Sequence, residues 1–333
     1  MNFCILGAGA WGTAMALHLH RCGNAVTLVP RRVEHATVLA TTRENEDYLP
    51  GVALPADIQI AHEPRPPLME ADVIMLACPS CGLRPLVEKI VGKLDSAWRS
   101  PTFISLVKGL EQHTLLRPSQ VLGERLPGRA YGVLSGPTNA REIARSLPSA
   151  AVLATTLDGD AARQLQAVMS SHVFRIYLSE DVVGVELGGI LKNVYAIGAG
   201  ICDGMGFGDN AKASYLTRAL QEMMRIGNAA GGRPETFLGL SGLGDLDATA
   251  HGEWSRNRAF GEALTRQGET VQGYLGASSN AVEGYRAAAC LMELVRARGV
   301  STPILAEIYG VLYSGNTPAQ SIASLMSRML TTE

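Results

Sequence analysis

The chain has 333 residues, of which 47% are hydrophobic, and its 29 basic and 31 acidic side chains give a formal net charge of -2. This length predicts two domains, with enough apolar sequence for a core in each. A balanced charge without a basic block argues against nucleic acid or an anionic membrane as a partner. Because neither a basic leader nor a run of about 18 uninterrupted apolar residues is present, we expect a cytoplasmic protein without a membrane span.

Short apolar runs alternate with amphipathic stretches through the first half of the chain. Strands are expected at 3–6, 25–29, 73–77, 102–107, 131–134, 150–154 and 174–177. Such alternation is typical of a mostly parallel sheet covered by helices. From about residue 182, apolar residues recur at helical spacing, most clearly over 213–227, 281–298 and 304–313. We therefore expect an α/β domain over 1–180 and an all-helical domain over 181–333.

A glycine-rich loop follows the first expected strand and precedes a helical stretch over 11–21. It contains Gly7, Gly9, Ala10, Trp11 and Gly12 in a G-x-G-x-x-G pattern. The first glycine permits a tight turn, the second lets backbone approach a diphosphate, and the third packs the helix against the strand. The helix N-terminus then faces the phosphates. We predict a Rossmann-type dinucleotide site here; a glycine-rich turn without a ligand is the alternative.

Two arginines follow the second expected strand, where NAD-preferring sites usually carry a carboxylate for the ribose 2′-hydroxyl. They are Arg31 and Arg32, with Glu34 close behind. Guanidinium groups can bind a 2′-phosphate through bidentate, charge-assisted hydrogen bonds. We therefore predict NADP as the preferred cofactor, with NAD also possible; the alternative is a solvated basic turn.

Two cysteines have the C-x-x-C spacing of redox and zinc sites, Cys78 and Cys81. A zinc site would need a second ligand pair at similar spacing, and the sequence has none. Buried apolar thiols are the commoner explanation. We therefore expect no metal.

Two lysines stand in positions suited to chemistry. Lys192 carries the one formal charge between residues 187 and 201, in a segment built for close helix packing. Burial there would lower its pKa toward the range useful for proton transfer, although the side chain could instead extend to the surface. Asn193 beside it suits either substrate orientation or helix packing. Lys108 follows an apolar strand, at the end where open α/β sheets bind ligands, although an exposed loop lysine is the simpler alternative.

Glycine-containing turns place further polar atoms. Asp245 ends the turn over 241–244, where it can hold a lysine ammonium or a substrate hydroxyl, or else cap a helix. Gly136 and Thr138 follow the strand expected at 131–134. Their backbone and hydroxyl groups can meet substrate oxygens, or simply form a turn.

A donor-rich turn contains Ser255, Arg256, Asn257 and Arg258. Hydroxyl, guanidinium and amide groups together suit a phosphate dianion. We predict that Arg256 and Asn257 bind the phosphate. Ser255 is a further candidate that could serve only as a helix cap, and Arg258 could be solvated.

Taken together, many segments closely resemble the NAD(P)-dependent glycerol-3-phosphate dehydrogenases, and the resemblance covers essentially the whole chain. Order and spacing both agree, which makes the resemblance more specific than the glycine loop alone. The segments are residues 7–12, 79–80, 108–111, 135–138, 188–194, 203–212, 242–246, 255–258, 282–284 and 303–315.

The resemblance implies a Rossmann domain, a helical substrate-binding and dimerisation domain, and a homodimer. It implies reversible hydride transfer between NAD(P)H and dihydroxyacetone phosphate, which gives sn-glycerol 3-phosphate, a glycerophospholipid precursor. Lys192 would be the general acid and base, and Lys108 would polarise the carbonyl. The cofactor residues implied beyond the glycine loop and the two arginines are Pro79, Lys108, Ala140, Arg256, Ala281 and Glu283.

Several residues depart from the family pattern. Asn139 stands where an aromatic is expected, Cys81 and Gly82 replace bulkier residues, and Ala250-His251 stands where the family tends to have a cysteine before a small polar run. These changes remove no catalytic group but bear on pocket shape and substrate. A related 3-hydroxyacid or 6-phosphogluconate-type dehydrogenase is therefore one alternative. A catalytically silent NADP-binding protein is another, although the presence of Lys108, Lys192 and Asp245 together argues against it.

Overall fold

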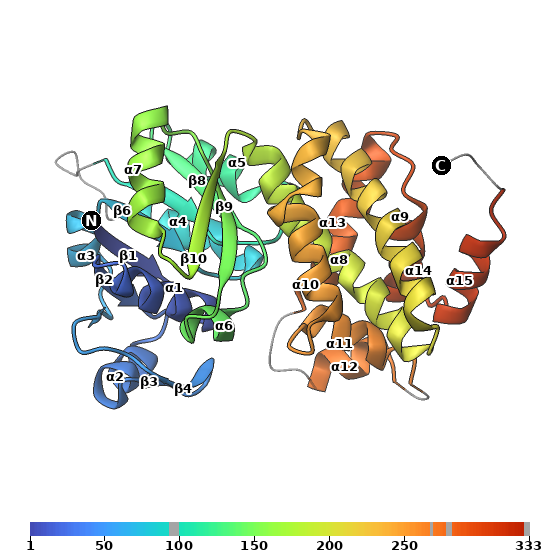
Figure 1. Cartoon of the computed structure of the whole chain (residues 1–333), viewed down its shortest axis with the longest axis horizontal. Helices are drawn as coiled ribbons and strands as arrows, with labels where there is room; N and C mark the ends of the chain where they lie inside the picture. The colour runs from blue at the N-terminus through green and yellow to red at the C-terminus, as the bar shows by residue number, and fades with distance from the viewer. Residues whose placement is uncertain (93–99, 267–268, 278–281, 330–333) are drawn as a thin grey trace.

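A computed structural model describes residues 1–92, 100–266, 269–277 and 282–329 of the chain. Figure 1 shows an α/β half at the N-terminus beside a helical half that ends at the C-terminus. One sheet of eight strands has the order β10-β9-β8-β7-β6-β1-β2-β5, and β3 and β4 form a separate hairpin. The strands are β1 (Asn2–Leu6), β2 (Ala25–Val29), β3 (Glu44–Asn45), β4 (Leu49–Ala53), β5 (Gln59–Ile60), β6 (Val73–Leu76), β7 (Thr102–Ser105), β8 (Tyr131–Ser135), β9 (Ser149–Thr155) and β10 (Phe174–Ser179).

Helices cover both faces of this sheet, as a sheet that is apolar on both faces requires. Buried residues of α1, α6 and α7 pack in one apolar cluster with the sheet, and those of α3, α4 and α5 in another. The helices of this half are α1 (Ala10–Arg21), α2 (Val33–Thr42), α3 (Arg65–Glu70), α4 (Leu83–Val91), α5 (Pro118–Arg125), α6 (Ala140–Ala144) and α7 (Gly159–Met169), with the 3₁₀ turn η1 (Ser80–Gly82).

The helical half is built around one buried helix, α8 (Val182–Gly204), which is buried from Gly184 to Cys202. By length and composition this helix is apolar enough to cross a membrane, but 89% of its apolar window is buried by its neighbours, as in a core helix. The surrounding helices are α9 (Gly208–Ala229), α10 (Asp245–His251), α11 (Arg256–Ala263), α12 (Val271–Ala277), α13 (Glu283–Ala297), α14 (Pro303–Tyr313) and α15 (Pro318–Met326), with the short turns η2 (Pro234–Leu238) and η3 (Leu240–Gly244).

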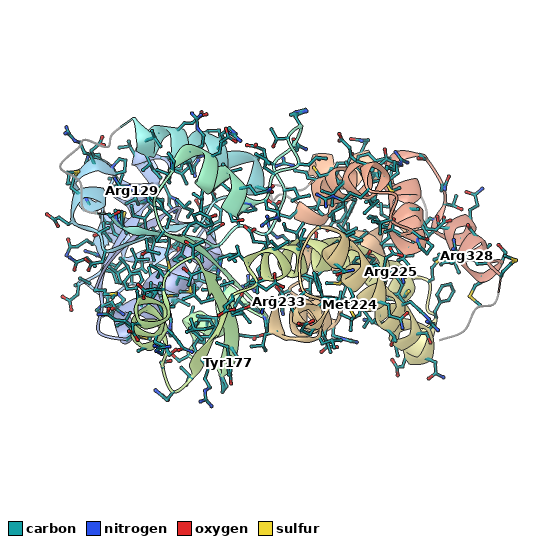
Figure 2. All side chains as sticks on the ribbon, turned by 90° about the horizontal axis from the view of Figure 1, so that it is seen from above. Arg129, Tyr177, Met224, Arg225, Arg233 and Arg328 are labelled. Atoms are coloured by element: carbon teal, nitrogen blue, oxygen red, sulfur yellow. The ribbon has the colours of Figure 1, made fainter. Side chains whose placement is uncertain are left out.

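Asp181 is the N-cap of α8, at the point where the chain passes from the sheet half to the helical half. Its carboxylate accepts hydrogen bonds from Gly184 N at 2.8 Å, Arg233 N at 2.8 Å and Thr236 Oγ1 at 2.7 Å. Figure 2 shows Arg233 between the two halves of the molecule. The single acidic side chain therefore caps α8 and holds the chain before η2 against it.

The mostly parallel sheet and the all-helical second half confirm the expected fold class. Two features were not expected. Strand β9 runs antiparallel to β8, because the short α6 between them cannot carry the chain back across the sheet. The β3–β4 hairpin and the two-residue strand β5 were missed, since runs this short carry little periodicity.

Candidate active site

The carboxyl ends of four neighbouring parallel strands lie along one edge of the sheet. Strands β1, β6, β7 and β8 are adjacent and parallel. The residues that follow them include Gly7, Pro79, Lys108 and Gly136, in that order across the sheet. The topology therefore brings the predicted cofactor loop and the predicted substrate residues to one edge, where open α/β sheets bind ligands.

The glycine loop has the close packing that a diphosphate site needs. Gly7 has φ +114°, and a Cβ there would lie 2.1 Å from Ala77 O; a Cβ on Gly12 would lie 2.0 Å from Gly7 O. A Cβ on Gly9 would meet no atom within 4 Å, so the backbone there faces open space. No side chain caps the N-terminus of α1, and the buried Nε1 of Trp11 has no partner in the described residues. These free donors fit a dinucleotide.

Arg31 and Arg32 are exposed immediately after β2, and Arg32 is the N-cap of α2. Within the described ranges, neither guanidinium forms an ion pair. Two unpaired cations beside the expected ribose position fit a 2′-phosphate. Glu34, in the first turn of α2, does not neutralise them by direct contact.

Lys108 and Lys192 bind the same carboxylate. Lys108 Nζ lies 2.6 Å from Asp245 Oδ2, and Lys192 Nζ lies 2.9 Å from Asp245 Oδ1. Lys108 lies in the segment after β7, Lys192 in α8 and Asp245 at the start of α10. Asp245 is the first residue of α10 and not its cap, so the helix-cap alternative for this residue is wrong.

Lys192 is buried, with 5% of its surface exposed, and therefore does not extend to solvent. Burial lowers the pKa of Lys192 to about 8, although the Asp245 carboxylate opposes this shift and Lys108 and Arg256 add to it. Thr249, which sequence reasoning missed, also accepts a hydrogen bond from Lys192 Nζ at 2.8 Å. Its position four residues after Asp245, on the same face of α10, is the signal that could have identified it.

Gly136 and Thr138 lie beside the first lysine. Lys108 Nζ donates to Gly136 O at 2.9 Å and lies 3.3 Å from Thr138 Oγ1. The Lys108 ammonium is therefore bound by the turn after β8 as well as by Asp245. A backbone carbonyl of this turn binds the lysine, so the turn does more than reverse the chain direction.

Two side-chain amides link the segment that carries Lys108 to the helical half. Asn193 donates to Lys108 O at 3.2 Å, and Asn257 Nδ2 donates to Asn193 Oδ1 at 2.9 Å. Asn257 Oδ1 accepts from Gly284 N at 3.0 Å. The two side chains thus connect the segment after β7 with α8, α11 and α13.

The residues of the turn over 255–258 have different contacts. Ser255 caps α11, since its Oγ accepts from Arg258 N at 3.2 Å. Arg258 binds Asp203, with 2.6 Å between Nε and Oδ2. Arg256 is exposed, and the described part of the chain offers its guanidinium no hydrogen bond or ion pair. Arg256 is therefore the guanidinium of this turn that is free to bind an anion.

Two of the remaining cofactor candidates, Pro79 and Glu283, lie where the two halves meet. Glu283 accepts a hydrogen bond from Ser80 Oγ at 2.9 Å, next to Pro79. Ala140 is the first residue of α6, and Asn139, which replaces the expected aromatic, caps that helix by accepting from Arg141 N at 2.9 Å. Ala281 lies outside the described residues.

Cys78 lies two residues before η1, and Cys81 lies within it, at the same junction. Burial raises the pKa of the Cys78 thiol to about 12, so this thiol is unreactive at neutral pH. Cys81 is exposed, and its Sγ lies 2.9 Å from Arg286 Nη1. Both are free thiols.

Comparison with known proteins agrees with this geometry. The model of the NAD-dependent glycerol-3-phosphate dehydrogenase N-terminus matches residues 2–161, and that of its C-terminus matches residues 181–323. The chain belongs to the NAD-dependent glycerol-3-phosphate dehydrogenase family. The alternative of a 3-hydroxyacid or 6-phosphogluconate-type dehydrogenase gives way to this family.

Relatives and solved structures of glycerol-3-phosphate dehydrogenases match over almost the full length. The chain is 43% identical to the NAD(P)+ glycerol-3-phosphate dehydrogenase of Thermus thermophilus, covering 98% of both chains. It is 40% identical to the enzyme of the same name from a Thermoanaerobacter species, covering 98% of this chain and 97% of the relative. The crystal structure of glycerol-3-phosphate dehydrogenase from Coxiella burnetii superposes with a TM-score of 0.91 at 32% identity, with 98% of each chain covered.

Proposed function

We propose that this protein reversibly reduces dihydroxyacetone phosphate to sn-glycerol 3-phosphate with NAD(P)H, a reaction that supplies a glycerophospholipid precursor. The observation that carries the proposal is the pair of lysines held by Asp245 between the two halves of the chain. Family membership supports the same reaction. NADP is the proposed preference, supported by the exposed Arg31 and Arg32.

Ketone reduction needs a hydride, a proton and stabilisation of negative charge on the carbonyl oxygen. When bound, NAD(P)H supplies the hydride. Lys192 donates the proton to the carbonyl oxygen and becomes a neutral amine, and in the reverse direction that amine removes the hydroxyl proton. The lowered pKa of Lys192, about 8, makes both protonation states accessible near neutral pH.

The other site residues bind and orient the substrate. We assign Lys108 to polarising the carbonyl, and Asp245 to holding both ammonium groups in place. Arg256 binds the phosphate dianion, supported by its exposure and its lack of a partner among the described residues. Asn193, Asn257, Gly136, Thr138 and Ser255 complete the substrate side.

The family resemblance also supports a homodimer in the cytoplasm and the division into a cofactor domain over 1–180 and a substrate domain over 181–333. The change from sheet to helix falls between Ser179, the end of β10, and Val182, the start of α8. The cofactor domain would therefore contribute the glycine loop and Lys108, and the helical domain Lys192, Asp245 and Arg256.

The test is NADPH oxidation with dihydroxyacetone phosphate, followed by the loss of NADPH absorbance. Lys192→Ala is expected to lower kcat by about 10²- to 10⁴-fold, the usual contribution of a general acid. NADPH binding, measured by tryptophan fluorescence, should survive the substitution. Lys89→Ala removes an exposed lysine from α4 and serves as the control with unchanged turnover.

Two outcomes would contradict the proposal. A wild-type protein that binds NADPH but turns over no substrate would be a catalytically silent NADP-binding protein. Turnover that persists in Lys192→Ala would remove Lys192 from its role as acid and base, while leaving the reaction itself intact.

A further inference from the structure

Asn45 is a buried polar residue that the proposed chemistry does not use. It lies in β3, at the start of the β3–β4 hairpin, and only 1% of its surface is exposed. A buried amide costs free energy unless its donors and acceptor are satisfied. Its partners therefore indicate what it holds in place.

All the hydrogen-bonding groups of the Asn45 amide are engaged. Nδ2 donates to Ala8 O at 2.9 Å and to Thr13 Oγ1 at 2.7 Å. Oδ1 lies 3.1 Å from His35 Nε2. Because a carbonyl oxygen only accepts, Ala8 O fixes which end of the amide is Nδ2, so Oδ1 faces His35 and His35 Nε2 carries the hydrogen.

These three partners belong to the two parts of the chain that we assign to the cofactor. Ala8 lies between Gly7 and Gly9 in the glycine loop. Thr13 is a buried residue of the first turns of α1. His35 lies in the first turn of α2, shortly after the exposed Arg31 and Arg32.

We propose that Asn45 is a positioning residue that fixes the glycine loop relative to the Arg31–Arg32 turn, with His35 as its contact to that turn. The inference rests on the proposed use of an NADP-type cofactor. Such a cofactor would place its diphosphate at the loop and its 2′-phosphate at the arginines. A fixed distance between the glycine loop and the two arginines favours NADPH, because this nucleotide would contact both.

The two residues therefore have different expected effects on the two nucleotides. Asn45 contacts the glycine loop directly, and both NADPH and NADH need that loop. His35 belongs to α2 and contacts Asn45 and the Tyr48 ring, and among the described residues it forms no hydrogen bond with the glycine loop. Only NADPH carries a phosphate for the arginines that precede α2. Loss of Asn45 should weaken both nucleotides, whereas loss of His35 should weaken NADPH selectively.

The experiment measures the Kd of NADPH and of NADH separately, by fluorescence titration of full-length variants without substrate. Asn45→Ala is expected to raise both Kd values by about fivefold or more, the factor that one hydrogen bond provides. His35→Ala is expected to raise the Kd of NADPH by about fivefold and that of NADH by less than about twofold. His35→Gln, which can offer an N–H to Asn45 Oδ1, should restore part of the NADPH affinity.

Glu44→Ala is the matched control. Glu44 Oε1 accepts from Gly51 N at 2.7 Å within the same hairpin, and among the described residues its carboxylate forms no hydrogen bond with the loop or with α2. This variant should lose hairpin stability, seen in its Tm, without changing either Kd. If Asn45→Ala fails to fold, the ratio of the two Kd values in His35→Ala still decides the matter.

Three results would overturn the inference. They are wild-type affinities in Asn45→Ala, an equal loss of both nucleotides in His35→Ala, and a Glu44→Ala variant that weakens binding as much as Asn45→Ala. A wild-type protein that binds neither nucleotide would remove the proposed function as well. Wild-type binding with unaffected variants would remove only the role of Asn45.

Discussion

Asp245 holds both lysines of the candidate site with one carboxylate. The Asp245 side chain is 1% exposed, and each of its oxygens faces a different ammonium group. The low dielectric of the interior strengthens each of these two ion pairs. The Asp245 carboxylate raises the pKa of Lys192, whereas burial lowers that pKa by a larger amount. The protonation of Lys192 therefore depends on Asp245.

The first residue-scale prediction concerns pH. In the proposed mechanism, reduction needs the protonated ammonium of Lys192, whose pKa of about 8 is lowered from 10.5. The rate of ketone reduction should therefore fall as pH rises through about 8. Oxidation of glycerol 3-phosphate needs the neutral amine and should rise over the same interval. Initial rates at saturating substrate and cofactor, measured in both directions, test this.

Asp245→Asn sharpens the same prediction. Removing the carboxylate removes the interaction that raises the pKa of Lys192. The pH at which the rate of ketone reduction falls should therefore be lower than in the wild type. Turnover at the optimum should also fall, because both lysines lose their shared partner. Asp247→Asn changes an exposed acid of the same helix and should leave the profile unmoved. If the reduction rate of Asp245→Asn falls at the wild-type pH, a group other than Lys192 controls the pH dependence.

Cofactor choice is a second residue-scale prediction. Arg31→Asp places a carboxylate where the 2′-phosphate of NADPH is expected, and like charges repel. The Kd of NADPH should rise by about 10-fold or more, while that of NADH changes by less than about threefold. Fluorescence titration with each nucleotide measures both constants. Equal weakening of both nucleotides would contradict the 2′-phosphate assignment.

Some site residues could be predicted from the sequence and others could not. Lys192 could be identified from the sequence because it is a single charge in an apolar helical segment. A buried ammonium group needs a charged partner or a shifted pKa. Thr249 has only its spacing of four residues from Asp245 as a signal, and Asn45 has none, since an asparagine in a hairpin is ordinary in composition. Their importance comes from contacts with Lys192 and Ala8, which only the folded chain brings close.

At the scale of elements, the long strands were predictable and the connections were not. An apolar run is buried wherever it lies in the sheet, so its existence follows from its composition. Direction depends on the connection: five residues of helix in α6 are too few for a parallel crossover, so β9 returns antiparallel. The β3–β4 hairpin depends on Asn45 and on the buried Leu49, neither of which forms a periodic pattern.

At the scale of the whole molecule, a second buried carboxylate connects the two halves. Glu186 lies in α8 with its side chain fully buried, at 0% exposure. It accepts from Ser119 N at 2.7 Å and from Arg117 Nη1 at 2.6 Å, both at the start of α5 in the sheet half. The helix that carries Lys192 therefore also caps a helix of the sheet half.

Glu186→Ala is expected to lower the free energy of unfolding by about 3–5 kcal/mol, because breaking a buried ion pair leaves Arg117 without its partner. It should also separate the thermal transitions of the two halves, since α5 and α8 lose their shared contact. Calorimetry of the variant tests both effects. Glu180→Ala removes an exposed acid, 3.5 Å from Arg233 at the same junction, and should change stability by less than about 0.5 kcal/mol. A single transition at the wild-type temperature in Glu186→Ala would mean that apolar packing between β8, β9 and α8 is sufficient to couple the halves.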